Sequence, residues 1–74
     1  MNITVHRENT LLIDEKDIKI VQSMANGGRA FGISEKMKLS ERTIENRIAI
    51  MLKKCKCKSS PHLVAFFLRN NLIK

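Results

Sequence analysis

Aromatic side chains are scarce in this sequence, which has three phenylalanines and no tryptophan or tyrosine among 74 residues. A surface that stacks unpaired bases on aromatic rings is therefore excluded. Three glycines and one proline argue against a loop-rich chain. The longest apolar run, residues 63–68, is far shorter than the roughly 18–20 residues that cross a bilayer, and residues 1–7 lack the pattern of a secretion signal. We therefore expect a soluble, cytoplasmic chain without membrane contact.

Cysteine is also rare, and the two cysteines, Cys55 and Cys57, stand two positions apart. This spacing is too short for an unstrained disulfide in regular structure. A metal site would need His62 and further ligands that the sequence does not offer at a recognisable spacing. We interpret both cysteines as reduced apolar residues and expect neither a metal nor a cofactor. No nucleophile and base, and no pair of carboxylates, are spaced for catalysis, so we do not expect an enzyme.

Positive charge is what the sequence has in excess, with a net charge of +7 and an isoelectric point near 9.9. The excess is focused, because residues 29–60 carry nine basic and three acidic side chains, whereas residues 1–28 carry three basic and four acidic ones. A charge that served only solubility would be spread evenly. The focused charge indicates an anionic partner.

Helix signals in the first half of the sequence predict two helices. Asp14 is a typical N-cap for a helix over about residues 15–26, and the glycine pair at 27–28 ends it. A short helix over about residues 29–37 follows, with apolar residues spaced along one face.

Two more helices are predicted in the second half, which makes the expected fold all-α with four helices. Ser40 is the expected N-cap of a helix over about residues 41–55. Ser60 is the expected N-cap of the last helix, about residues 60–70, with Pro61 in its first position. We expect residues 13–74 to form one domain and residues 1–12 to be an arm or a linker remnant.

The third predicted helix has an apolar stripe on one side and polar residues, among them Arg42, Asn46 and Lys53, on the opposite side. A short helix, a tight turn and a following helix with a basic outer face are typical of a helix-turn-helix. Such a helix fits the major groove of B-DNA. Any three-helix bundle with a basic helix would give a similar pattern.

A more specific signal comes from two segments, the helix start Leu39-Ser40-Glu41-Arg42-Thr43-Ile44 and the last helix with its closing residues Leu63-Val64 and Asn71-Leu72-Ile73, and the turn Ala25-Asn26-Gly27 agrees with them. With them, residues 13–73 resemble the LuxR/NarL/GerE-type helix-turn-helix domain of bacterial transcription regulators, in register and without gaps. The resemblance implies a four-helix domain that binds double-stranded DNA sequence-specifically. It also implies a possible receiver or ligand-binding domain on the N-terminal side, since many relatives are response regulators whereas others stand alone at this length.

The resemblance further implies roles for individual residues. The face that the family presents to base edges is occupied here by Arg42, Glu45, Asn46 and Ala49. The residues expected near DNA phosphates are Thr43, Arg47, Lys53, Lys54, Lys16 and Arg29. A homodimer contact through the last helix is expected to use Leu63, Phe66 and Phe67.

Departures from the family pattern affect this reading. Where this chain has Glu45 the family usually has lysine, and where it has Arg47 the family usually has histidine. The DNA sequence that relatives bind therefore cannot be assumed for this chain. Glu45 can accept a hydrogen bond from cytosine N4, or pair with Arg42 or Arg47. Two other functions stay open at this point: a promoter-recognition domain like that of sigma factors, and a protein-interaction module that uses the apolar last helix.

Overall fold

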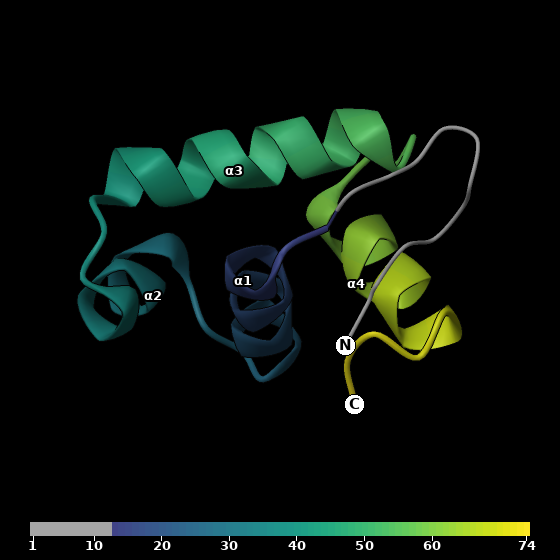
Figure 1. Cartoon of the computed structure of the whole chain (residues 1–74), viewed down its shortest axis with the longest axis horizontal. Helices are drawn as coiled ribbons and strands as arrows, with labels where there is room; N and C mark the ends of the chain where they lie inside the picture. The colour runs from purple at the N-terminus through teal and green to yellow at the C-terminus, as the bar shows by residue number, and fades with distance from the viewer. Residues whose placement is uncertain (1–12) are drawn as a thin grey trace.

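Four helices make up the described part of the chain, residues 13–74, in the computed structural model (Figure 1). They are α1 (Glu15–Ala25), α2 (Ala30–Met37), α3 (Glu41–Lys54) and α4 (Ser60–Arg69), and residues 13–74 contain no strand. The expected all-α fold is confirmed. The predicted N-terminal arm, residues 1–12, lies outside the described residues.

The ends of α1 follow from local chemistry. The backbone N–H of Asp17 donates to Asp14 Oδ1 at 3.0 Å, so Asp14 caps the helix as its position in the sequence predicts. After the helix, the Gly28 N–H donates to the carbonyl oxygen of Ser23 at 2.8 Å. A Cβ at Gly28 would lie only 2.9 Å from that oxygen, so the chain needs glycine to turn this tightly toward α2.

Two lysines in the left-handed backbone conformation flank α3. Lys38 and Lys56 both have φ of 56°, a conformation that costs a residue with a Cβ about 1–2 kcal/mol. Between them, α3 begins at a regular cap, where the Thr43 N–H donates to Ser40 Oγ at 3.0 Å. The chain therefore bends sharply immediately before and after this helix.

The start of α4 differs by one residue from the sequence prediction. Ser59, not Ser60, is the N-cap, and its Oγ accepts a hydrogen bond from the His62 N–H at 3.3 Å. Pro61 is accordingly the second residue of the helix, where an N–H also lacks a partner within the helix. The two adjacent serines offer the same capping chemistry, and the Lys58 N–H also donates to His62 Nδ1 at 3.1 Å in this turn.

All four helices and the segments beside them contribute to one core. Its buried members are Ile13, Ile20, Val21, Ile33, Ile44, Met51, Leu63, Phe67 and Ile73. Leu63 and Phe67 have no exposed surface. They pack inside their own chain, which corrects their expected place at a dimer contact. Phe66, the third residue of that prediction, is half-buried.

The two cysteines lie at the end of α3 and in the segment after it, and both are half-buried free thiols. Burial raises the pKa of Cys55 to about 11, and burial also raises the pKa of Cys57. Both thiols are therefore protonated at neutral pH and weak nucleophiles. Residues 13–74 contain no group of three or more metal-ligating side chains. None of their helices has the length and apolar character needed to cross a membrane.

Candidate nucleic-acid interface

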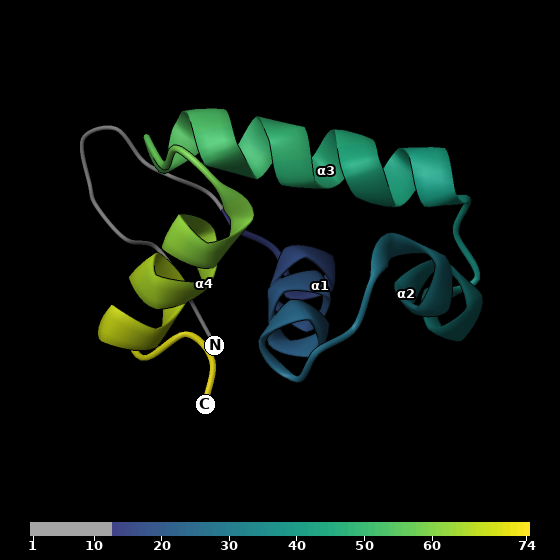
Figure 2. The same ribbon diagram turned by 180° about the vertical axis from the view of Figure 1, so that it is seen from behind.

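α3 runs along one edge of the molecule, and the other three helices lie together on one side of it (Figures 1 and 2). Each of α1, α2 and α4 contacts α3. Ile44 and Met51 of α3 are buried on this covered side. Because helical residues advance by about 100° each, the opposite side of α3 must face solvent.

The exposed side of α3 is the surface on which the base-edge prediction depends. Arg42, Glu45, Asn46 and Ala49 are all exposed, as is Lys53 one turn further along. We call these five residues the recognition face. The structure therefore brings all four base-edge candidates together on one surface that no part of residues 13–74 covers.

The residues predicted near phosphates are more dispersed. Lys16 of α1, Arg29 before α2, and Lys53 and Lys54 at the end of α3 are exposed. Thr43 is half-buried, and its Oγ1 accepts a hydrogen bond from Ser40 Oγ at 2.9 Å. The four exposed cations thus belong to three different helices or their borders.

Arg47 differs from the other candidates because it is already engaged. Its Nη1 donates to Asp17 Oδ1 at 3.0 Å and lies 3.6 Å from Asp14 Oδ1. The hydrogen bond to Asp17 is the main reason why the pKa of Arg47 is raised. The pKa of Asp14 is lowered, mainly by the bond from the Asp17 N–H and also by the charge of Arg47.

Among the described residues, the exposed large apolar side chains are Phe31, Ile50 and Leu68, and the sequence assigns none of them an individual role. Ile50 on α3 is 52% exposed and follows Asn46 by one helical turn, so it borders the recognition face. Phe31 on α2 is 63% exposed. The signal for Ile50 was its place outside the apolar stripe of α3. For Phe31, the spacing of apolar residues in α2 did not indicate whether the side chain would be exposed.

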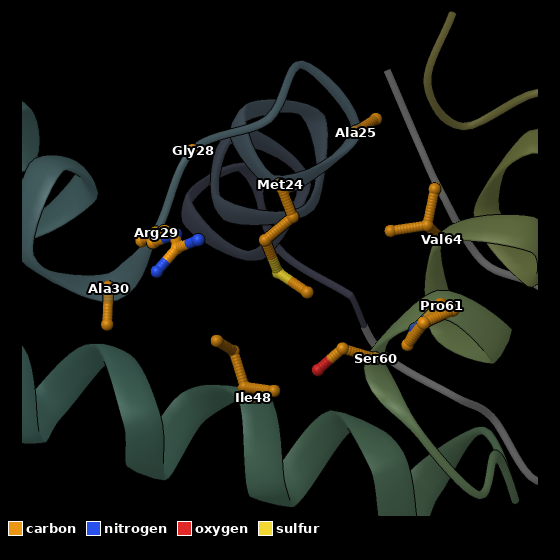
Figure 3. A pocket seen from close by; sticks show the side chains of 9 residues that line it. All are labelled: Met24, Ala25, Gly28, Arg29, Ala30, Ile48, Ser60, Pro61 and Val64. Atoms are coloured by element: carbon orange, nitrogen blue, oxygen red, sulfur yellow. The ribbon is translucent and has the colours of Figure 1, made fainter.

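A shallow pocket of about 510 Å³ lies beside α3. Figure 3 shows Met24 of α1, Ile48 of α3 and Val64 of α4 around it, with the Arg29 guanidinium reaching in from the start of α2. Within residues 13–74, the residues that line it are Met24, Ala25, Gly28, Arg29, Ala30, Ile48, Ser60, Pro61 and Val64. Arg29 is the one ionisable residue among these described lining residues.

The short α2, the tight turn at residues 38–40 and the longer α3 with its exposed polar face define a helix-turn-helix protein. The profile of the family described as bacterial regulatory proteins, luxR family (GerE), matches residues 14–67. The chain belongs to this family. The matched residues are thus a helix-turn-helix domain of the kind that this family of bacterial regulatory proteins contains.

One relative carries a regulatory description of its own. The "uncharacterized transcriptional regulatory protein YxjL" of Bacillus subtilis (strain 168) is 30% identical over 60 residues. That alignment covers 81% of this chain and 28% of the relative. The chain thus spans little more than a quarter of that protein's length, and the similarity concerns the helix-turn-helix region.

Proposed function

We propose that this chain recognises a specific double-stranded DNA sequence by inserting α3 into the major groove with the recognition face toward the base edges. The observation that carries the proposal is the two-sidedness of α3. Ile44 and Met51 are buried, whereas Arg42, Asn46 and Lys53 are exposed. A helix anchored on one side, with long polar side chains on the other, has the size and chemistry that the groove accepts.

Each side chain of the recognition face has a base edge that it suits. Arg42 can donate two hydrogen bonds to guanine, and Asn46 can pair with the N6 and N7 edge of adenine. Ala49 can contact the methyl group of thymine, and Glu45 can accept from cytosine N4. Sequence preference should therefore be concentrated at the base pairs under these four residues.

The exposed cations are proposed to hold the DNA backbone. Lys53 and Lys54 lie at the end of α3, and Arg29 and Lys16 lie on the borders of α2 and α1. Thr43 stands in the first turn of α3, where helix N–H groups favour an anion. Contacts of this kind fix the orientation of the protein on the duplex without reading its sequence.

The salt dependence of binding tests this proposal. A preferred duplex is first selected from a random pool, and its affinity is then measured by fluorescence anisotropy between 50 and 200 mM NaCl. If about 4–6 phosphates are neutralised per protomer, log affinity should fall with a slope of about −4 to −5 per protomer. A flat dependence, or no duplex binding at low salt, would refute the proposal and favour the interaction module.

Asn46→Ala provides the test of base reading within the same assay. The substitution should cost about 1–3 kcal/mol on the preferred duplex and remove the preference at one base pair. Asn26→Ala, at the exposed end of α1, is the matched control and should leave the preference intact. An unchanged preference in Asn46→Ala would exclude this residue from base readout.

We also propose that two copies of the chain pair through the outer side of α4. Since Leu63 and Phe67 face the core, the outer side at helical spacing contains Pro61, the half-buried Ala65 and Leu68, with the exposed Arg69 beside them. Leu68 is 45% exposed. Small and apolar residues at this spacing suit close packing against the same helix of a second copy, with the half-buried Phe66 at the edge.

Leu68→Lys should weaken such a dimer. A charged side chain at the centre of an apolar helix pair is expected to raise the dimer dissociation constant by at least about ten-fold, because the ammonium group loses water without gaining a partner. Sedimentation equilibrium measures this. Phe31→Lys, which changes another exposed apolar residue to the same cation, is the control. If both variants associate like the unmodified chain, α4 is not the dimer contact.

A further inference from the structure

The Arg47 guanidinium joins two helices through a nearly buried carboxylate. Its Nη1 donates to Asp17 Oδ1 at 3.0 Å, and Asp17 is only 8% exposed. A carboxylate at such a position is costly unless a partner compensates its charge. Asp14 adds a second, longer contact at 3.6 Å from the same nitrogen. The ion pair is therefore part of the packing between α1 and α3 and not an occasional surface contact.

The location of this ion pair connects it with the recognition face. Asp14 and Asp17 are the N-cap and the third residue of α1, and Asp14 also accepts the Asp17 N–H bond. Arg47 lies near the middle of α3, next to Asn46 in the sequence and about 100° around the helix from it. A rotation of α3 that moved Asn46 would thus have to lengthen the Arg47–Asp17 bond.

We propose that Arg47 is a positioning residue, which sets the rotation of the recognition face by binding Asp17 of α1; this inference rests on the proposed function. This assignment replaces the phosphate contact expected from the sequence. If the guanidinium turned to a phosphate, the Asp17 carboxylate would stay nearly buried and unpaired beside a polyanion. The cost of leaving the Asp17 carboxylate unpaired therefore favours the arrangement in which Arg47 stays bound to α1.

Asp17→Asn distinguishes a positioning role of Arg47 from a phosphate-binding role, because the two roles predict opposite changes in DNA binding. If Arg47 positions α3, weakening its partner should lower the ratio of specific to non-specific DNA affinity by about ten-fold, a typical coupling between contacting residues. If Arg47 binds phosphate, the same substitution removes a negative charge and releases the guanidinium. Binding to all duplexes should then tighten, with the ratio unchanged.

Asp14→Asn is the matched control for charge. It makes the same chemical change at the more distant partner, and asparagine still caps α1. Any increase in DNA affinity that comes only from removing one negative charge should be equal in the two variants. The positioning role predicts that the loss of specificity occurs in Asp17→Asn and not in Asp14→Asn.

Arg47→Ala and the double variant Arg47→Ala/Asp17→Asn complete the experiment. Positioning predicts that Arg47→Ala lowers the specificity ratio, leaves the salt slope unchanged, and is not made worse by the second substitution. A slope reduced by about 1, with equal losses on all duplexes, identifies a phosphate contact and overturns the proposal. Circular dichroism establishes that each variant is folded at the assay temperature.

A measurement on the unmodified chain keeps the test independent of variant folding. Positioning predicts that the side-chain nitrogen resonances of Arg47 show a persistent hydrogen bond to Asp17 in the presence and absence of the selected duplex. Loss of that bond on DNA binding overturns the proposal. If the unmodified chain prefers no duplex at all, the proposed function fails. A retained preference with tighter binding by Asp17→Asn refutes only the positioning role.

Discussion

Phe67→Ala should abolish most of the stability of the fold. Phe67 is fully buried, and truncation of a buried phenylalanine costs about 3–5 kcal/mol through lost apolar burial and the cavity that remains. A chain of 74 residues has a total stability of only about 4–11 kcal/mol. In thermal melts followed by circular dichroism, we expect the midpoint to fall by roughly 15–30 °C.

Phe31→Ala is the control for this prediction, since it makes the same substitution at a side chain that is 63% exposed. Its midpoint should stay within a few degrees of the unmodified chain. If Phe67→Ala melted at a similar temperature to Phe31→Ala, the inward orientation of Phe67 would be wrong. The outer side of α4 would then have to be redefined, together with the dimer contact proposed on it.

Ala49→Glu should have the largest effect on DNA binding. Ala49 lies at the centre of the recognition face, where a carboxylate would be placed against base edges and between two phosphate backbones. We expect affinity for the selected duplex to fall by about 100-fold or more at 100 mM NaCl, because the new charge is repelled and loses its hydration. The fold should be unaffected, since the side chain is exposed.

Ala25→Glu is the control for Ala49→Glu, because it makes the same substitution at an exposed alanine away from the recognition face. Ala25 is an exposed alanine at the end of α1, so the substitution changes the net charge by the same amount. Long-range repulsion alone should therefore weaken both variants equally, by a few-fold. Equal losses in the two variants would show that α3 does not enter the groove through its recognition face.

Local signals were sufficient to predict the helices and their order. The caps Asp14 and Ser40, and the glycine turn after α1, depend on hydrogen bonds within a few residues, which a sequence pattern can express. The start of α4 was displaced by one residue because Ser59 and Ser60 offer the same chemistry. The Ser59 cap is accompanied by a second local bond, from the Lys58 N–H to His62 Nδ1 four residues away.

Contacts between distant segments were less predictable. The apolar run of α4 has no polar face, so its periodicity could not show that Leu63 and Phe67 point inward; the positions of α1 and α3 determine this. Arg47 was assigned to phosphate because it is a cation beside the recognition face. Its bond to Asp17, 30 residues earlier, arises from the way α1 crosses α3 and has no local signature.

Because Lys38 and Lys56 have a left-handed backbone, a substitution that raises thermal stability at either position is expected to lower the proposed DNA affinity. Glycine would adopt the same bend with less strain, so replacing either lysine should make the fold more robust. Each replacement would also remove a cation at an end of the helix that carries the recognition face. If the proposed function holds, a variant selected for heat tolerance alone would therefore bind duplex DNA less tightly than the unmodified chain.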